Sequence, residues 1–256
     1  MRSAGLIEAI GISDALLLLG SAFVAGALNA VAGGGSFLTL PALMATGVPS
    51  AVANATGTLA LLSGYLSGAW AMRSDIAAPP GLSTRLVLGL SVLGGATGAF
   101  LLLWTPDAVF RQVIPWLLLF ATCLFVVGPR AALRQGKSSP STGVAVCGVL
   151  GVTVYGGYFN GGLGILLLAL FGALGQAKLL AANGLKNVVS ALLTLIAVVV
   201  YVSGDLIAWR EAALMSVAAL AGGYIGGRGV RRLPMRWVRG AIVAIGLSMS
   251  VVFFFR

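Results

Sequence analysis

Four polar side chains interrupt an apolar segment in the second half of the chain. Asn183, Lys186, Asn187 and Ser190 follow the spacing i, i+3, i+4 and i+7, which places them on one face of a helix. A lysine inside an apolar helix costs ~3 kcal/mol on membrane-insertion scales and by default indicates a functional site. An ammonium group beside amide donors is suited to binding an anion. The alternative is that Lys186 extends along the helix to the membrane surface.

Two glycine-rich breaks could provide further anion ligands, because each precedes a short apolar piece. The breaks are Gly33, Gly34 and Gly35, followed by Ser36, and then Gly161, Gly162 and Gly164. A glycine turn that opens a short helix exposes backbone N–H groups, which attract anions. We expect Gly34 or Gly35 to require a positive φ or a close approach to substrate. Close helix packing is the alternative explanation for these glycines.

The two breaks belong to a weak internal repeat. A shift of 129 positions places Gly33 and Gly35 on Gly162 and Gly164, and it places Asn54 on Asn183. An asparagine amide can bind an anion through its NH2 group, although asparagines also join helices inside membranes. Asn29 and Asn160 flank the breaks but are two positions out of register, so they are weaker candidates. Paired interrupted segments in two halves indicate the binding site of a secondary transporter.

The sequence therefore predicts a site for a small anion. The predicted substrate-binding residues are Gly33, Gly34, Gly35, Ser36, Asn54, Thr58, Gly161, Gly162, Gly164, Asn183, Lys186 and Asn187. No catalytic, metal-binding or cofactor-binding residues are predicted. The chain has no histidine, its six acids lie near helix ends or in loops, and Cys123 and Cys147 occur singly. These residues offer little to acid–base, nucleophilic or metal chemistry.

The composition identifies the elements that must hold this site. Of 256 residues, 59% are hydrophobic and 9% are charged, which is typical of an integral membrane protein. Long apolar runs exclude the alternation of a transmembrane β-barrel. The net charge of +10 comes from basic residues in short loops between apolar runs, so we expect no nucleic-acid partner.

The predicted fold is an all-α polytopic membrane protein with two inverted-topology repeats of about five helical segments each. The first repeat covers residues 1–135 and the second 136–256, separated by a loop from Gly128 to Pro140. The expected helical pieces are Ala15–Ala32, Ser36–Thr46, Ser50–Met72, Leu86–Trp104, Val109–Val127, Val144–Phe159, Ile165–Leu174, Leu179–Val202, Glu211–Gly227 and Val238–Phe255. Two of them are short and broken, and the sequence does not decide whether they cross the membrane or re-enter.

Loop charges predict the orientation in the membrane. Basic loops lie on the cytoplasmic side of a membrane, which predicts Gly136 and Arg232 to be cytoplasmic and Asp107 and Asp205 to be periplasmic. This arrangement places both termini in the periplasm and makes the two repeats enter from opposite sides. We expect Lys178 to be an interfacial residue.

The chain resembles the sulfite exporter TauE/SafE family of membrane transporters. The likeness covers nearly the whole chain and rests on the stretch NAVAGGGSFLTLPALMATGVPSAVANATGT and on the looser copy NGGLG…AANGLKN. The resemblance implies a permease of the bacterial inner membrane for small anions, typically sulfur oxyanions or organosulfonates such as sulfite and sulfoacetate. It implies no cofactor. The chain has no cysteine near these motifs, which weighs against thiosulfate transport by thiol chemistry.

The expected function is therefore secondary transport of a small anion, with membrane lipid as the surrounding partner. Homo-oligomerisation is compatible with the sequence. One alternative is a channel-like pore for an anion or neutral solute. A second is an intramembrane enzyme, which the missing histidine and the absence of acids within the spans disfavour.

Overall fold

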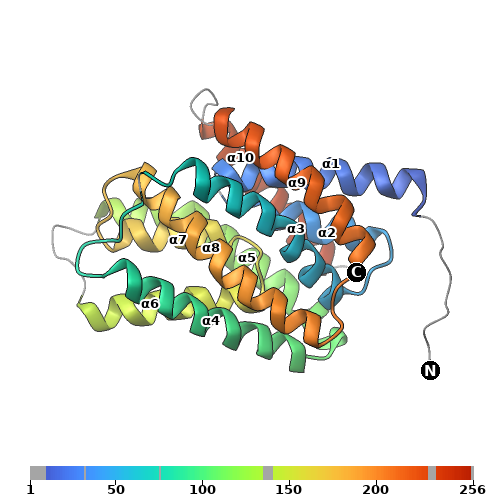
Figure 1. Cartoon of the computed structure of the whole chain (residues 1–256), viewed down its shortest axis with the longest axis horizontal. Helices are drawn as coiled ribbons and strands as arrows, with labels where there is room; N and C mark the ends of the chain where they lie inside the picture. Colours follow the sequence, from blue (N-terminus) through green and yellow to red (C-terminus); the bar gives the residue numbers. More distant parts are fainter. Residues whose placement is uncertain (1–9, 32, 75, 135–140, 230–234, 255–256) are drawn as a thin grey trace.

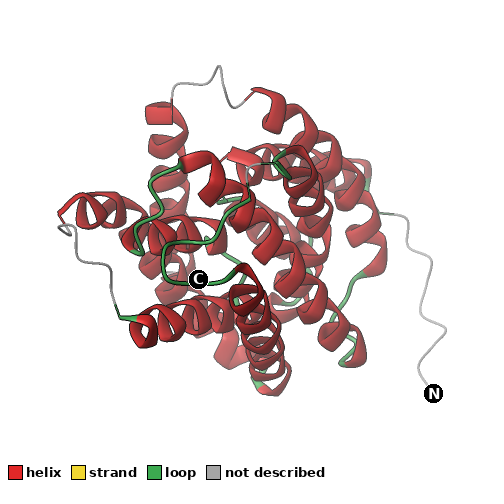
Figure 2. Ribbon diagram, turned by 60° about the vertical axis from the view of Figure 1, so that its left-hand side comes forward, coloured by secondary structure: helices red, strands yellow, loops and turns green. Residues whose placement is uncertain are grey.

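A computed structural model describes residues 10–31, 33–74, 76–134, 141–229 and 235–254. These residues form helices joined by short loops, and no strand occurs among them (Figure 2). The helices are α1 (Ile12–Val31), α2 (Ser36–Ala45), α3 (Ser50–Ala71), α4 (Thr84–Trp104), α5 (Asp107–Arg134), α6 (Thr142–Tyr158), α7 (Leu163–Ala173), α8 (Leu179–Ser203), α9 (Trp209–Gly229) and α10 (Met235–Phe254). The predicted all-α polytopic plan with two short helices is confirmed.

Among the described residues, four helices are long and apolar enough to cross a membrane by length and composition. They are the segments Ile12–Ala30, Thr84–Trp104, Asp107–Leu124 and Leu180–Ser203. Large apolar side chains such as Trp104, Trp116 and Val199 are exposed on the outside of the bundle. By contrast, α2 and α7 have 10 and 11 residues. At 1.5 Å per residue, each is about half the length that a ~30 Å hydrocarbon core requires.

Corresponding helices of the two halves have corresponding packing partners, and each of these partners belongs to the other half. Helix α1 packs on α9, and α6, its counterpart five helices later, packs on α4. In the same way α3 packs on α9 while α8 packs on α4, and α3 and α8 contact each other. Glycines permit these close crossings. A Cβ atom on Gly98 would collide with the carbonyl oxygen of Val154, and one on Gly226 would lie 2.6 Å from the Cα of Ala27.

Hydrogen bonds show that α3 and α8 run in opposite directions. Asp107 accepts hydrogen bonds from the Ser50 hydroxyl and the Ala51 N–H, both at 2.7 Å, so α3 begins beside the start of α5. We call this the Asp107 end. The Gln176 side chain donates to the carbonyl oxygen of Ala77 at 3.0 Å, so α8 begins beside the loop that follows α3. We call this the Gln176 end.

The far end of α8 returns to the Asp107 end. A Cβ atom on Gly204, just after α8, would collide with the side chain of Leu103 near the end of α4. Figure 1 shows α4 and α8 running together toward the right-hand side of the view, where α4 turns into α5. Asp107, at the start of α5, and the loop that contains Asp205 therefore lie at the same end of the molecule.

One predicted boundary is wrong. The expected loop began at Gly128, but α5 continues through Gly128 and Pro129 to Arg134. A proline removes one backbone hydrogen bond and favours a kink, and a long helix can tolerate it. The repeat boundary at residues 135 and 136, and the predicted cytoplasmic positions Gly136 and Arg232, lie outside the described residues. The inverted orientation of the repeats stays a prediction.

Candidate functional site at the crossing of two broken helices

The two glycine breaks meet in the middle of the protein. Gly33 has φ = 87° and Gly162 has φ = 76°, a left-handed conformation that favours glycine. These two residues correspond under the 129-position shift. A Cβ atom on Gly33 would collide with the Cα of Gly164, and one on Gly164 would lie 2.6 Å from the Cα of Gly33. The main chains of the two breaks are therefore in direct contact.

The same contact brings the N-terminal ends of α2 and α7 together. Ser36 is the first residue of α2, and its hydroxyl donates to the carbonyl oxygen of Asn160 at 3.2 Å. That oxygen also accepts the N–H of Leu163, the first residue of α7, at 3.2 Å. The first N–H groups of a helix lack helical partners, and the helix dipole makes this end positive. Two positive helix ends therefore lie side by side.

Lys186 places an ionisable amine at this crossing. The side chain is 0% exposed, and its Cδ would lie 3.2 Å from a Cβ atom on Gly164. Its Nζ donates to the main-chain oxygen of Asn29 at 2.9 Å, and no described carboxylate pairs with it. An ammonium group can donate three hydrogen bonds, so part of its capacity is unused. Complete burial rules out the alternative in which Lys186 reaches the membrane surface.

Asn29 and Asn160 are central to the site, although the sequence ranked them low. The Asn29 side chain accepts the N–H of Gly35 at 2.8 Å while its main-chain oxygen holds Lys186. Asn160 accepts the Tyr65 hydroxyl at 2.8 Å and donates to the Thr194 hydroxyl at 3.3 Å. The available signal was their position beside both glycine breaks.

The predicted asparagines fall into two groups. Asn54 donates to the main-chain oxygen of Tyr158 at 3.2 Å, and Thr58 donates to the oxygen of Asn54 at 2.7 Å. Both belong to the first turns of α3, toward the Asp107 end. Asn183 and Asn187 are also buried, but their side-chain oxygens have no hydrogen-bond partner. The structure thus groups Gly33, Gly164 and Lys186 at the crossing and distributes the amides on either side of it.

The positive φ expected at Gly34 or Gly35 lies instead at Gly33. Gly35 has φ = −61°, which any residue can adopt. Close approach does occur at Gly35, since a Cβ atom there would lie 2.5 Å from the Ala25 oxygen and 2.9 Å from Cγ of Asn29. Gly161 lies against the ring of Phe159, and its oxygen accepts the Tyr155 hydroxyl at 2.7 Å.

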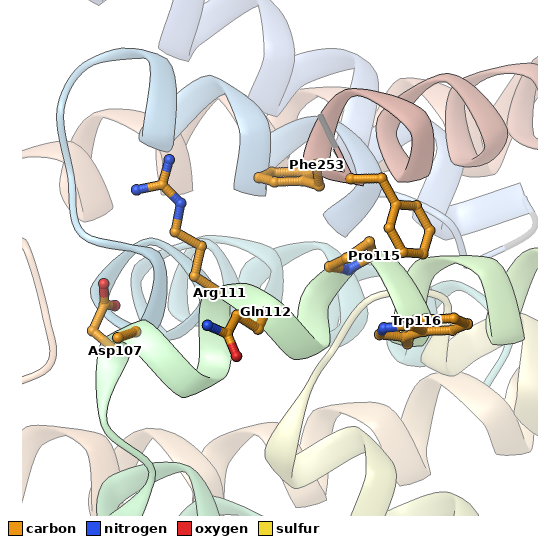
Figure 3. Close-up of a pocket in the computed structure, with 8 residues that line it drawn as sticks. Asp107, Arg111, Gln112, Pro115, Trp116 and Phe253 are labelled. Atoms are coloured by element: carbon orange, nitrogen blue, oxygen red, sulfur yellow. The ribbon is translucent and has the colours of Figure 1, made fainter. Parts of the chain in front are cut away.

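A separate cavity of about 580 Å³ lies between α5 and α10. Figure 3 shows Arg111 near Asp107 at one side of it and Trp116 and Phe253 at the other. None of the predicted site residues lines this cavity. It opens near the Asp107 end and is distinct from the crossing of the glycine breaks.

Comparison with known proteins identifies the family. A family model described as "Sulfite exporter TauE/SafE" matches residues 18–253. A probable membrane transporter protein of Haemophilus influenzae is 29% identical over 248 residues, which is 94% of each chain. The probable membrane transporter protein YfcA of Escherichia coli K12 is 27% identical over 241 residues, covering 91% of this chain and 88% of the relative. No solved structure matches significantly. The chain therefore belongs to the sulfite exporter TauE/SafE family and is a membrane transporter.

Proposed function

We propose that this protein is a secondary permease that moves a small anion across the bacterial inner membrane. The observation that carries the proposal is the fully buried Lys186, which has no acidic partner among the described residues and lies where two broken helices cross. A buried charge without a counter-ion is costly, and a bound anion would compensate it. The family description makes a sulfur oxyanion or organosulfonate, such as sulfite or sulfoacetate, the proposed substrate class.

The groups around Lys186 are suited to binding rather than to catalysis. The N-terminal ends of α2 and α7 would contribute the positive potential of their helix dipoles, and the Ser36 hydroxyl, which donates to the Asn160 oxygen, lies between them. A small oxyanion has several acceptor oxygens, so it can use the ammonium and the helix ends together. We therefore propose transport and no enzymatic step.

The antiparallel run of α3 and α8 supports inverted-topology repeats of residues 1–135 and 136–256. In secondary transporters with such repeats, the binding site lies near the bilayer midplane between discontinuous helices, with their N-termini toward an anionic group. The Gln176 end carries Arg73 and Lys178 on the loops that lie there, so we propose that it faces the cytoplasm and that both termini are periplasmic.

Transport against a gradient tests the proposal. The purified protein would be reconstituted into lipid vesicles, and entry of labelled sulfite or sulfoacetate would be measured under an imposed proton or sodium gradient. We expect the anion to accumulate above its external concentration under at least one gradient. A channel-like pore would only bring the anion to electrochemical equilibrium across the membrane. If no anion enters the vesicles, the proposed function is contradicted.

A thermal-shift series would identify the substrate class beforehand. The detergent-purified protein would be heated with sulfite, sulfate, thiosulfate, sulfoacetate or acetate at equal ionic strength. A ligand that binds only the folded protein raises its stability by mass action, by about 2.7 kcal/mol at a hundredfold excess over Kd. We expect a sulfur oxyanion or organosulfonate to give the largest shift.

A further inference from the structure

Two corresponding sets of buried polar residues approach the crossing from opposite ends of the molecule. Asn54 and Thr58 form the first set, the α3 stripe. Asn183, Asn187 and Ser190 form the second, the α8 stripe. The 129-position shift places Asn54 on Asn183 and Thr58 on Asn187. Because α3 and α8 run in opposite directions, the α3 stripe lies toward the Asp107 end and the α8 stripe begins toward the Gln176 end.

The two stripes differ in their hydrogen bonding. The α3 stripe is paired within the protein, through Asn54 to the oxygen of Tyr158 and Thr58 to the oxygen of Asn54. In the α8 stripe, the side-chain oxygens of Asn183, Asn187 and Ser190 are buried and have no partner. Across the crossing, the Asn29 amide nitrogen is also unpaired. Thr39 Oγ1, in α2 beside Gly57, is unpaired as well and belongs to neither stripe.

Unpaired buried polar groups need a partner that the protein chain does not supply. Each costs ~1–3 kcal/mol when it is left without a hydrogen bond. Folded proteins satisfy nearly all such groups, commonly with ordered water. The unpaired atoms of the α8 stripe occupy successive turns of one helix face, on both sides of Lys186. Water molecules along this face would satisfy them and would connect the ammonium group to solvent.

We propose that the α8 stripe is a hydrated route by which the anion passes from the Gln176 end along Asn183 and past Lys186 as far as Ser190, while the paired α3 stripe closes the opposite side. The inference rests on the proposed function and adds the path and its open side. The Asn183 NH2 group and the Ser190 hydroxyl can donate to water or to an anion in transit, whereas the Asn187 NH2 group donates to Sδ of Met72 at 3.8 Å. Gly68 allows this face of α8 to pack closely against α3, since a Cβ atom on Gly68 would lie 2.7 Å from Nδ2 of Asn187.

Cysteine labelling tests which stripe is accessible. The exposed Cys123 and Cys147 would first be replaced by serine. Single cysteines would then be introduced as Asn183→Cys and Ser190→Cys in the α8 stripe, and as Asn54→Cys and Thr58→Cys in the α3 stripe. Lys178→Cys, in the exposed loop before α8, would mark the Gln176 side. A membrane-impermeant charged thiol reagent would be applied to oriented vesicles from that side.

We expect labelling in the α8 stripe to be at least about tenfold faster than in the α3 stripe, because thiol reactivity requires access to water. Sulfoacetate, a sulfonate that does not react with thiol reagents, should slow labelling of the α8 stripe only. Equal rates in both stripes, or no labelling at positions 183 and 190 while Lys178→Cys reacts, would overturn the proposal. Ser190→Cys and Thr58→Cys change little in size, so this pair carries the comparison if an asparagine variant does not fold.

The result also separates this inference from the proposed function. Fast labelling of the α8 stripe that no tested anion slows would support the hydrated route and count against the anion site. Tight anion binding in the parent, combined with equal labelling of both stripes, would support the anion site and reject the route.

Discussion

The ammonium group of Lys186 is held by a single described hydrogen bond to a main-chain oxygen. Structural lysines in protein interiors are normally paired with carboxylates, since the cost of removing a charge from water is several kcal/mol. In this protein the desolvation cost of the lysine arises where two helix N-termini also contribute positive potential. Concentrated positive charge of this kind destabilises the empty protein and favours an anion in the site.

This reasoning predicts that Lys186→Met stabilises the protein in the absence of ligand. Replacing a buried, unpaired charge by an apolar side chain of similar length removes its desolvation cost, with an expected gain of ~1–4 kcal/mol. Thermal unfolding of the detergent-purified protein in an anion-free buffer would measure it. Lys178→Met, at an exposed position, is the control and should change the unfolding temperature little. A clearly less stable Lys186→Met protein would assign a structural role to the lysine.

The sequence alone could identify Lys186, because a lone cation in an apolar helix is visible in the residue pattern. It could not identify the partner of Lys186. The main-chain oxygen of Asn29 accepts that hydrogen bond, and a main-chain group leaves no signature in the sequence. The sequence gives Asn29 and Asn160 little weight because they lie two positions out of register in the ungapped repeat. Their importance follows from three-dimensional contacts on both sides of the glycine breaks.

At the scale of elements, the short helices α2 and α7 define the site because both begin at the crossing. Their approximate extents could be predicted from glycine breaks and apolar length, and the structure places α2 at Ser36–Ala45 and α7 at Leu163–Ala173. Which glycine carries the positive φ could not be predicted within a triplet, because every glycine permits it. The contact between Gly33 and Gly164, from different halves, decides that position.

We predict that Gly33→Ala abolishes transport and lowers stability, whereas Gly47→Ala leaves transport near the parent level. Both glycines have positive φ, 87° and 86°, so both variants incur a strain of ~1–2 kcal/mol. A Cβ atom on Gly33 would collide with Gly164, but nothing lies within 4 Å of a Cβ atom on Gly47. Vesicle uptake and thermal unfolding would be measured for both. Similar losses in the two variants would mean that backbone strain alone explains the effect.

A larger substitution at Gly35 is less informative. Gly35→Leu is expected to abolish transport, but a side chain there would press against the Ala25 oxygen and Asn29. The α1–α2 packing would then be disturbed together with the site, so loss of activity would not separate packing from binding. The Gly33 and Gly47 pair avoids this ambiguity.

At the scale of the whole molecule, the start of α5 at Asp107 and the loop that contains Asp205 share one end, and the loops around Ala77 and Gln176 share the other. The distribution of basic residues predicts that Asp107 and Asp205 share one side, but it makes no prediction for the Gln176 loop. The sequence could not show that α3 and α8 contact each other, because few identities link the two halves and helix contacts depend on small residues that are frequent throughout the chain.

We predict that Asp107 and Asp205 face the periplasm and that Lys178, Gly136 and Arg232 face the cytoplasm. Reporter fusions after each position, or single cysteines labelled in whole cells and in inverted vesicles, would establish the side. The orientation follows from the excess of basic residues on cytoplasmic loops. Finding Asp107 and Arg232 on the same side would be incompatible with inverted repeats.

The most direct test of the anion site is a titration of the best anion from the thermal-shift series against the parent, Lys186→Gln and Lys178→Gln in detergent at fixed salt. A charge-assisted hydrogen bond contributes ~1–3 kcal/mol, so Lys186→Gln should weaken binding roughly 5- to 150-fold. Lys178→Gln should bind as the parent does. If Lys186→Gln binds as tightly as the parent, the lysine is not a ligand and the account of the site is wrong.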